Sequence, residues 1–351
     1  MISRVALREN LASAWAAVLR GFSTGAASSR FNRLMVVIVG SLLVFDIVLA
    51  GFLRLNGLKE LEAVVQLFVG SPGMLILIGA CWYCRWRGEG LHRMGDVAQL
   101  AAWTLLVIPA ISFLIPVAGR SPYPLVDGGL AKIDAALHFH TVTYVHLVAG
   151  LPRVRHALAI AYNFLPPIIV AAMVVPPLCA KALDSRRYMF AVLIVAVVTS
   201  ALFALWPAAG PWTVEGFAPS KDQSVVVESL AFFKSGQPMP DRLKDSGVVA
   251  FPSFHVILAV LSVVALWRIR WVKWFALAIG ILISISTITT GWHYGIDVLA
   301  GLAVAFLAQV IANRIVEPVR VPAAPDIVRD AQVPDGVTSR AQKSSQATTS
   351  N

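Results

Sequence analysis

The stretch Thr289–Val310, TTGWHYGIDVLAGLAVAFLAQV, decides how the rest of the chain is interpreted. From Val298 onward it is small and apolar, with no charged residue before Arg314, as expected of a membrane-spanning helix. His293 and Asp297 stand at its beginning, four residues apart. Residues at this spacing share one face of a helix, and ionisable residues at a membrane-spanning segment are typically functional. The stretch therefore predicts a spanning helix with a functional pair at its mouth.

The composition of the whole chain indicates a membrane protein. Of its 351 residues, 58% are hydrophobic and 14% are charged, and the mean hydropathy is +0.74. Soluble domains carry about 25% charged residues, so this chain has too much apolar surface for a soluble fold. The net charge of +10 is explained by membrane topology, and we expect no nucleic-acid partner. The predicted class is an all-α polytopic membrane protein.

Eight apolar segments are long enough to cross a bilayer. They lie at residues 34–53, 62–84, 97–118, 157–180, 188–206, 252–268, 271–289 and 294–313. Arginine and lysine collect before the first segment and in the second-to-third, fourth-to-fifth and sixth-to-seventh connections. With eight spans these places share one side of the membrane, and the positive-inside rule makes that side the cytoplasm. We therefore expect a bacterial inner-membrane protein with both termini in the cytoplasm.

This topology divides the chain into four parts. They are a cytoplasmic segment with the pattern of an interfacial helix (1–33), an accessory two-helix membrane segment (34–96), a six-helix catalytic core (97–313) and a disordered cytoplasmic tail (314–351). Two long connections face outward. Residues 119–156 contain an amphipathic stretch with Asp127 and Asp134 seven apart, for which we favour a solvated helix face over head-group or cation binding. Residues 207–251 form a polar loop too long for a bare linker.

A second motif stands at the mouth of the sixth segment, Phe251–Val260, FPSFHVILAV. One helical hairpin separates it from the eighth segment, so His255 and His293 return to the same membrane face, at helix mouths outside the packed centre. Pro252 is favourable in a first helical turn. The backbone N–H groups around Phe254 and the positive end of the helix dipole suit phosphate oxygens.

Together the two motifs predict phosphoryl transfer through a covalent histidine. Asp297 hydrogen-bonds one imidazole nitrogen of His293 and fixes its tautomer, which leaves the other nitrogen free to attack phosphorus. His255 then protonates the departing oxygen and later takes a proton from the acceptor. The hydroxyl of Ser253 adds a donor for the phosphate.

The motifs PSFH and HYGID carry a resemblance to the type-2 phosphatidic acid phosphatase superfamily, whose second motif is P-S-G-H and whose third ends H-x-x-x-D. The resemblance covers the six spans of the core. It implies His293 as nucleophile, His255 as proton donor, Asp297 as orienter and Ser253 as phosphate ligand.

Departures from the family pattern indicate a particular branch. The Lys-x6-Arg-Pro motif is absent from residues 207–251, Thr287 replaces the arginine of the third motif, and Phe254 replaces the glycine of the second. Two cations for the phosphate are therefore unaccounted for, and candidates in the outer loop are Lys221, Lys234, Arg242 and Lys244. The Pro-rich WPAAGPW and the stretch Leu125–Leu137 resemble the inositol phosphorylceramide synthase branch, which transfers a phosphorylated head group between lipids.

The predicted function is therefore a lipid phosphotransferase that works at the outer membrane face through a phosphohistidine. The alternative is a lipid phosphate phosphatase, of phosphatidic acid or polyprenyl pyrophosphate type, with water as acceptor. The partners are a membrane phospholipid or lipid phosphate and a lipid or water acceptor. We expect no cofactor and no metal. The sequence does not fix the oligomeric state.

Two functions of other classes compete with this prediction. A proton-coupled transporter with His–Asp relays is disfavoured because the ionisable residues gather at one mouth, apart from Asp46, which we expect to pair with a polar group in the bundle. Haem or metal binding between His255 and His293 would leave Ser253 without a role.

Overall fold

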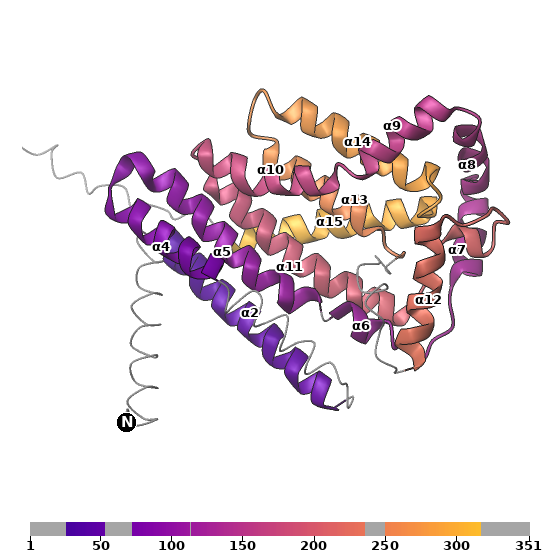
Figure 1. Ribbon diagram of the computed structural model, residues 1–351, viewed down its shortest axis with the longest axis horizontal. Coiled ribbons are helices and arrows are strands. Elements are labelled where there is room, and N and C mark those ends of the chain that lie inside the picture. Colours follow the sequence, from indigo (N-terminus) through magenta and orange to yellow (C-terminus); the bar gives the residue numbers. More distant parts are fainter. Residues whose placement is uncertain (1–25, 53–71, 113, 236–249, 317–351) are drawn as a thin grey trace, which may run out of the picture. The chain divides into compact units, whose positions relative to one another are not determined.

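The computed structural model describes residues 26–52, 72–112, 114–235 and 250–316 (Figure 1). The elements in these ranges are helical, in agreement with the predicted class. The α-helices are α2 (Ala26–Phe52), α4 (Pro72–Trp86), α5 (His92–Ser112), α6 (Leu114–Ala118), α7 (Asp127–Ala136), α8 (Thr141–Ala149), α9 (Pro152–Tyr162), α10 (Leu165–Leu178), α11 (Ala182–Leu205), α12 (Lys221–Ser235), α13 (Phe254–Leu266), α14 (Lys273–Thr289) and α15 (Gly295–Ile315).

Four helical stretches within the described ranges are long and apolar enough to cross a membrane: His92–Ser112, Pro152–Leu178, Ala182–Leu205 and Gly295–Ile315. Helices α13 and α14 are apolar but shorter. Large apolar side chains face outward, among them Ile76 at 67% and Phe306 at 67% exposure. A surface of this kind needs a lipid environment, so the chain is a membrane protein. The count of eight spans is not established: four described helical stretches qualify, α13 and α14 are shorter than a full span, and residues 62–71 of the second predicted segment lie outside the described part.

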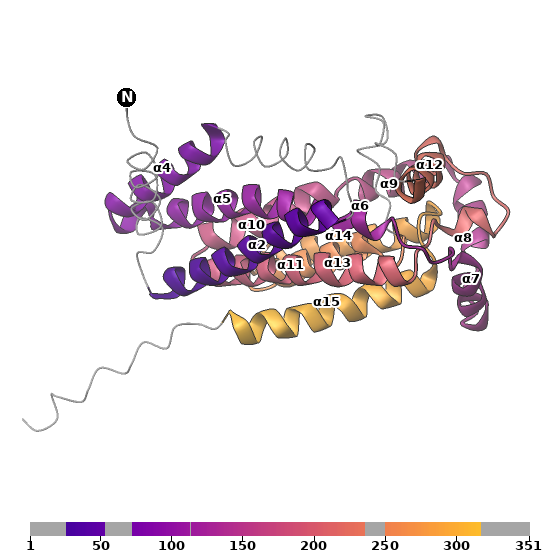
Figure 2. The same ribbon diagram turned by 90° about the horizontal axis from the view of Figure 1, so that it is seen from below.

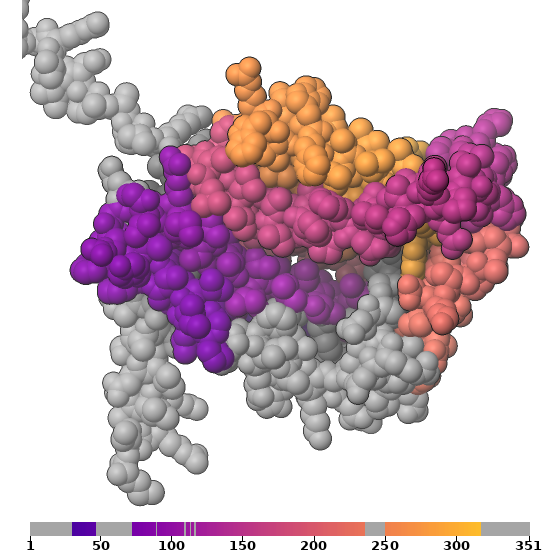
Figure 3. Space-filling model, turned by 45° about the horizontal axis from the view of Figure 1, so that its top comes forward, coloured from indigo at the N-terminus to yellow at the C-terminus, as the bar shows by residue number. Residues whose placement is uncertain are grey.

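The predicted span at residues 157–180 is divided into two helices. Helix α9 ends at Tyr162, where the side-chain amide of Asn163 donates to the Ala159 carbonyl. Pro166 and Pro167 then occupy the first turn of α10, where the missing N–H groups cost little. After the break α9 and α10 run in different directions (Figure 1), and α9 lies against α14 (Figure 3).

Helices α10, α11, α13 and α15 pack around one apolar cluster (Figures 1 and 2). Ile257 and Leu261 of α13 are fully buried in it. At Gly301 of α15 a Cβ atom would stand 3.0 Å from the carbonyl oxygen of Ser253. The absence of a side chain at this position therefore lets α15 approach the beginning of α13.

The predicted accessory segment is joined to this core. Helix α2 begins at Ala26, earlier than the predicted boundary at residue 34. Its residues Phe31, Met35 and Val39 belong to the same apolar cluster. Asp46 of α2 is fully buried, and neither carboxylate oxygen has a hydrogen-bond partner among the described residues, so the partner expected for it is not found there.

The connection at residues 207–251 contains a helix that the sequence interpretation missed. Ser220 and Gln223 form a reciprocal cap at the start of α12, with N–H to side-chain distances of 2.8 and 3.2 Å. The apolar face of α12 (Val226, Leu230, Phe233) packs against Phe203 and Trp212, and Trp292 borders the same cluster. The amide of Gln223 also donates to the Thr290 carbonyl at 3.2 Å. Helix α12 is thus tied to the turn that precedes His293.

Candidate active site

The first turn of α13 holds the second motif. Ser253 is the N-cap: its Oγ accepts from the Val256 N–H at 3.5 Å, and the helix begins at Phe254. We had predicted Pro252 in the first turn of the helix, but it precedes the helix. The N–H of Ser253 donates to the backbone carbonyl of Asp297 at 3.1 Å. This bond fixes the mouth of α13 against the mouth of α15.

The imidazole of His293 lies in the tight turn before α15. The backbone N–H groups of Trp292 and His293 both donate to the Thr287 carbonyl, at 3.0 and 3.1 Å, which holds the turn. Nδ1 of His293 is 2.8 Å from the carbonyl oxygen of Ala250 and 3.4 Å from Oδ2 of Asp297. Because a carbonyl oxygen only accepts, Nδ1 carries the proton and Nε2 keeps its lone pair.

Asp297, the partner predicted for His293, is therefore farther from Nδ1 than the Ala250 carbonyl is. Asp297 lies within ion-pair distance, but its Oδ2 also accepts the N–H of Tyr294 at 2.9 Å. The other oxygen, Oδ1, is buried without a partner among the described residues. Ala250 was not predicted, because it contributes a main-chain carbonyl and any residue supplies one.

The two predicted histidines lie side by side. The ring centroids of His255 and His293 are 6.1 Å apart. Tyr162, at the end of α9, stacks on His255 with a centroid distance of 4.3 Å and an interplanar angle of 23°. Trp292 lies nearly parallel to Tyr162 at 6.2 Å, and Trp212 meets Trp292 edge-on at 5.7 Å. Aromatic rings therefore form one wall of the site.

Burial sets the charge state of His293. Its side chain is almost completely enclosed, at 3% exposure, which is at odds with the position outside the packed centre that we predicted. Desolvation lowers the pKa of His293 from 6.5 to about 4, although the hydrogen bond to Ala250 acts in the opposite direction. The imidazole is therefore neutral at physiological pH and suited to act as a nucleophile.

Asp134 caps the helix that follows His293. Its two carboxylate oxygens accept the N–H groups of Gly295 and Ile296, at 2.6 and 2.7 Å, and the residue is fully buried. Burial raises the pKa of Asp134, and these two hydrogen bonds counteract that rise. The solvated helix face that we favoured is wrong for this residue: the carboxylate caps the first two N–H groups of α15, beside the bond that Asp297 accepts from the Tyr294 N–H at the same helix start.

Asp127 holds the Pro-rich loop in the same way. Its carboxylate accepts from the N–H groups of Ala209 and Gly210, at 3.0 and 2.8 Å, and from the hydroxyl of Tyr294 at 3.3 Å. It is 3% exposed, so a solvated face is wrong here too. Burial raises the pKa of Asp127, opposed by the same bonds. Because seven residues make about two helical turns, Asp127 and Asp134 lie on the same, buried side of α7.

The remaining predicted phosphate ligands are placed less favourably. Phe254 is half-buried and packs against the apolar core. Lys234 is exposed near the end of α12, and its ammonium donates to the Tyr123 carbonyl at 3.2 Å. Arg242 and Lys244 lie outside the described residues. Within those residues no group of three or more His, Cys, Asp or Glu side chains is arranged to hold a metal ion.

Besides Ala250, two further contributors to the site were missed from the sequence. Gln223 follows Ser220 at the spacing of a capping box, a signal that was present and not used. Tyr162 stands in an apolar run where nothing marks it, since its role depends on where α9 ends.

Comparison with known proteins identifies the family of the chain. No curated protein and no solved structure matches the chain. Residues 128–311, more than half of the chain, match the family model of the PAP2 superfamily. The match covers both histidines, Asp297 and the elements that position them, and it starts later than the core predicted from residue 97. The chain belongs to the PAP2 superfamily.

Proposed function

We propose that this chain is an integral-membrane lipid phosphotransferase that moves a phosphorylated head group between lipids, as in the inositol phosphorylceramide synthase branch. Members of the superfamily are generally phosphatases or phosphotransferases, and the apolar helices fit a lipid substrate. The observation that carries the proposal is the orientation of His293. Its Nδ1 is bound to the Ala250 carbonyl, and its ring centroid is 6.1 Å from that of His255.

In the first step Nε2 of His293 attacks the phosphorus of the donor lipid. A P–N bond forms, and the bond between phosphorus and the oxygen of the lipid alcohol breaks. His255 gives its proton to the departing oxygen, which leaves as a neutral alcohol. The negative charge of the bound phosphate favours the protonated form of His255 that this step requires.

In the second step an acceptor hydroxyl attacks the phosphohistidine. His255, now neutral, takes the proton of that hydroxyl, the P–N bond breaks, and His293 is restored. The backbone N–H groups of Phe254 and His255 and the hydroxyl of Ser253 lie at the start of α13. In this proposal they stabilise the charge of the phosphate.

The enclosure of the site supports an alcohol acceptor over water. His293 is 3% and Trp212 is 7% exposed, and the aromatic wall adds apolar surface beside the histidines. A site enclosed in this way excludes water, so in this proposal a phosphohistidine there is shielded from hydrolysis until a lipid hydroxyl enters.

The test uses purified protein in detergent with phospholipids labelled in the head group, with and without a ceramide or diacylglycerol acceptor. We expect label in a new lipid only when acceptor is present. Free inorganic phosphate that is indifferent to acceptor would instead establish a lipid phosphatase.

His293→Gln is the inactive reference, because a glutamine amide can still donate to the Ala250 carbonyl and so limits the loss of folding. We expect turnover to fall at least about 10⁴-fold, as for loss of a covalent nucleophile. His146→Gln, an exposed histidine on α8, is the matched control and should keep wild-type turnover. Turnover that survives His293→Gln would refute the mechanism.

A further inference from the structure

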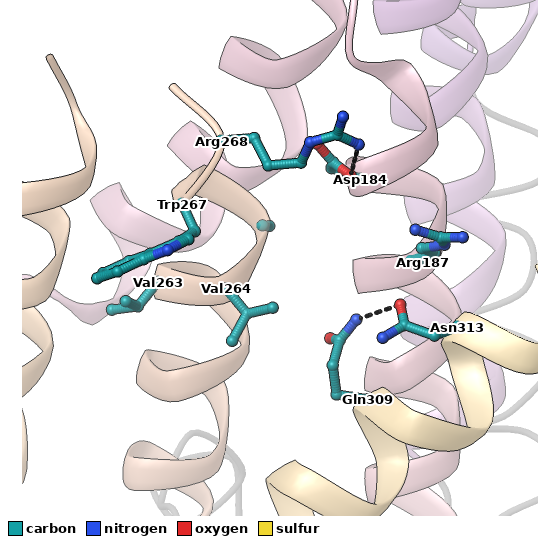
Figure 4. A pocket seen from close by; sticks show the side chains of 9 residues that line it. Asp184, Arg187, Val263, Val264, Trp267, Arg268, Gln309 and Asn313 are labelled. Carbon is teal, nitrogen blue, oxygen red and sulfur yellow. Dashed lines mark hydrogen bonds and ion pairs between the residues drawn. The ribbon is translucent and has the colours of Figure 1, made fainter. Parts of the chain in front are cut away.

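A pocket lies at the end of α13 opposite to His255 (Figure 4). It has a volume of about 460 Å³ and is bordered by the beginning of α11, the end of α13 and the last turns of α15. From His255 to Trp267 the helix rises roughly 20 Å. The pocket is therefore separate from the site described above, and nothing in the proposed phosphotransfer uses it.

Three cations surround one carboxylate at this pocket. Nη1 of Arg268 is 3.6 Å from Oδ1 of Asp184, and the Arg268 side chain is 62% exposed. Arg187 donates through Nε to the Val316 carbonyl at 3.0 Å, which orients its guanidinium. The Lys181 ammonium donates to the backbone carbonyl of Arg268. The net charge is positive, so the pocket is suited to an anion.

The carboxylate itself has an unused acceptor. The Asp184 side chain is 9% exposed, and its Oδ2 has no hydrogen-bond partner among the described residues. A buried oxygen of this kind is stabilised when a donor reaches it. The complement to this pocket is therefore an anion that also carries a hydroxyl group.

Apolar surface adjoins the charges. Val264 is 39% and Trp267 is 43% exposed, and both line the pocket (Figure 4). Trp271 and Trp274 stand close by in sequence at 81% and 62% exposure, in the manner of an aromatic belt at the level of lipid head groups. The acyl chains of a lipid can pack against this apolar surface, whereas a free inorganic anion has no apolar part to contact it.

We propose that this pocket binds the head group of an anionic glycerophospholipid, with its phosphate between Arg187 and Arg268 and a head-group hydroxyl on Asp184. The acyl chains lie over Val264 and Trp267. Basic pockets between membrane helices bind anionic head groups in this way, and Arg is well suited to phosphate because its planar fork donates two parallel bonds. A lipid bound here connects the beginning of α11 with the end of α13.

The test measures lipid retention of the full chain in detergent by native mass spectrometry, and thermal unfolding in parallel. The added probes are phosphatidylglycerol, phosphatidylcholine and inorganic phosphate. We expect phosphatidylglycerol to be retained and to raise Tm, and the other two to do neither. Equal effects of phosphatidylcholine would overturn the preference for an anionic lipid, and an equal rise of Tm with inorganic phosphate would overturn the lipid as occupant.

Arg268→Gln should lower phosphatidylglycerol retention about tenfold or more, whereas Arg270→Gln, an exposed arginine of the same connection, should not change it. Arg268→Lys keeps the charge and loses the fork, and should lie between wild type and Arg268→Gln. Equal retention by the two glutamine variants would overturn the site. His293→Gln should keep full retention, and a loss there would place the lipid at the catalytic histidines instead.

Discussion

At the scale of single residues, His293 is held by two acceptors of unequal distance. The Ala250 carbonyl at 2.8 Å is enough to fix the tautomer, and the Asp297 carboxylate lies farther from Nδ1, at 3.4 Å. A negative charge near Nδ1 stabilises the cationic ring that forms as Nε2 bonds to phosphorus. We therefore propose that Asp297 acts through its charge more than by holding the ring in place.

From this we expect Asp297→Asn to lower kcat roughly 10- to 100-fold and to change KM little, because the Ala250 carbonyl still holds the ring. Steady-state kinetics on the labelled lipid measures both quantities. A kcat equal to that of wild type would contradict the electrostatic role. A loss as large as that of His293→Gln would mean that Asp297, and not Ala250, sets the tautomer.

The burial of His293 also predicts the pH dependence. Its pKa in the folded protein is about 4, below the ordinary value of 6.5, so the neutral nucleophile persists well below pH 6.5. We expect the acid limb of kcat/KM to lie below pH 6. Because the folded pKa is lowered, the stability that His293 contributes is present above pH 6.5 and is lost as the pH falls towards 4. An acid limb at pH 6.5 or above would contradict a buried neutral nucleophile.

At the scale of helices, the first two N–H groups of α15 are capped by a side chain of another helix. Asp134 on α7 supplies both acceptors, as no side chain at the start of α15 accepts from Gly295 or Ile296 within the described structure. We expect Asp134→Ala to cost about 1–2 kcal/mol of folding free energy and to lower turnover, because the turn carrying His293 loses its anchor.

Thermal unfolding and turnover of Asp134→Ala are compared with those of Lys132→Ala, an exposed neighbour on α7. Lys132→Ala should match wild type in both. If Asp134→Ala unfolds at the wild-type temperature and keeps full turnover, the cap has no role in positioning the site.

How much of this was predictable depends on the kind of contact. The helical segments and the pairing of His255 with His293 followed from hydropathy and from spacing, because one hairpin returns the chain to the same end. The roles of Asp127 and Asp134 did not follow, since an acidic residue in an outer loop is usually solvated and only the folded chain shows which N–H groups it reaches. The Ala250 carbonyl leaves no trace in the side-chain pattern at all.

At the scale of the whole molecule, the distribution of charge predicts its orientation. Lys181, Arg187 and Arg268 gather at the end of α13 opposite to the histidines. From the positive-inside rule we predict that this end lies in the cytoplasm and the histidines lie at the outer face. The topology is tested in sealed right-side-out vesicles with a membrane-impermeant maleimide.

The vesicle experiment uses a background in which Cys81, Cys84 and Cys179 are alanine. Lys221→Cys at the start of α12 should be labelled without detergent, and Arg270→Cys in the α13–α14 connection only after the membrane is opened. Both residues are exposed on the protein surface, so a difference in labelling reports the side of the membrane on which each residue lies. The reverse pattern would place the histidines at the cytoplasmic face.

The bond between His293 and the Ala250 carbonyl has a consequence for the mutational tolerance of the chain. A main-chain oxygen is present whichever residue occupies position 250, so substitutions that keep the path of the backbone keep the bond. A saturation screen would then report a strict requirement at His293 and, among small residues, a permissive one at its nearest partner. The path of the backbone therefore sets the orientation of the His293 ring, and a search for invariant side chains would not find the group that holds it.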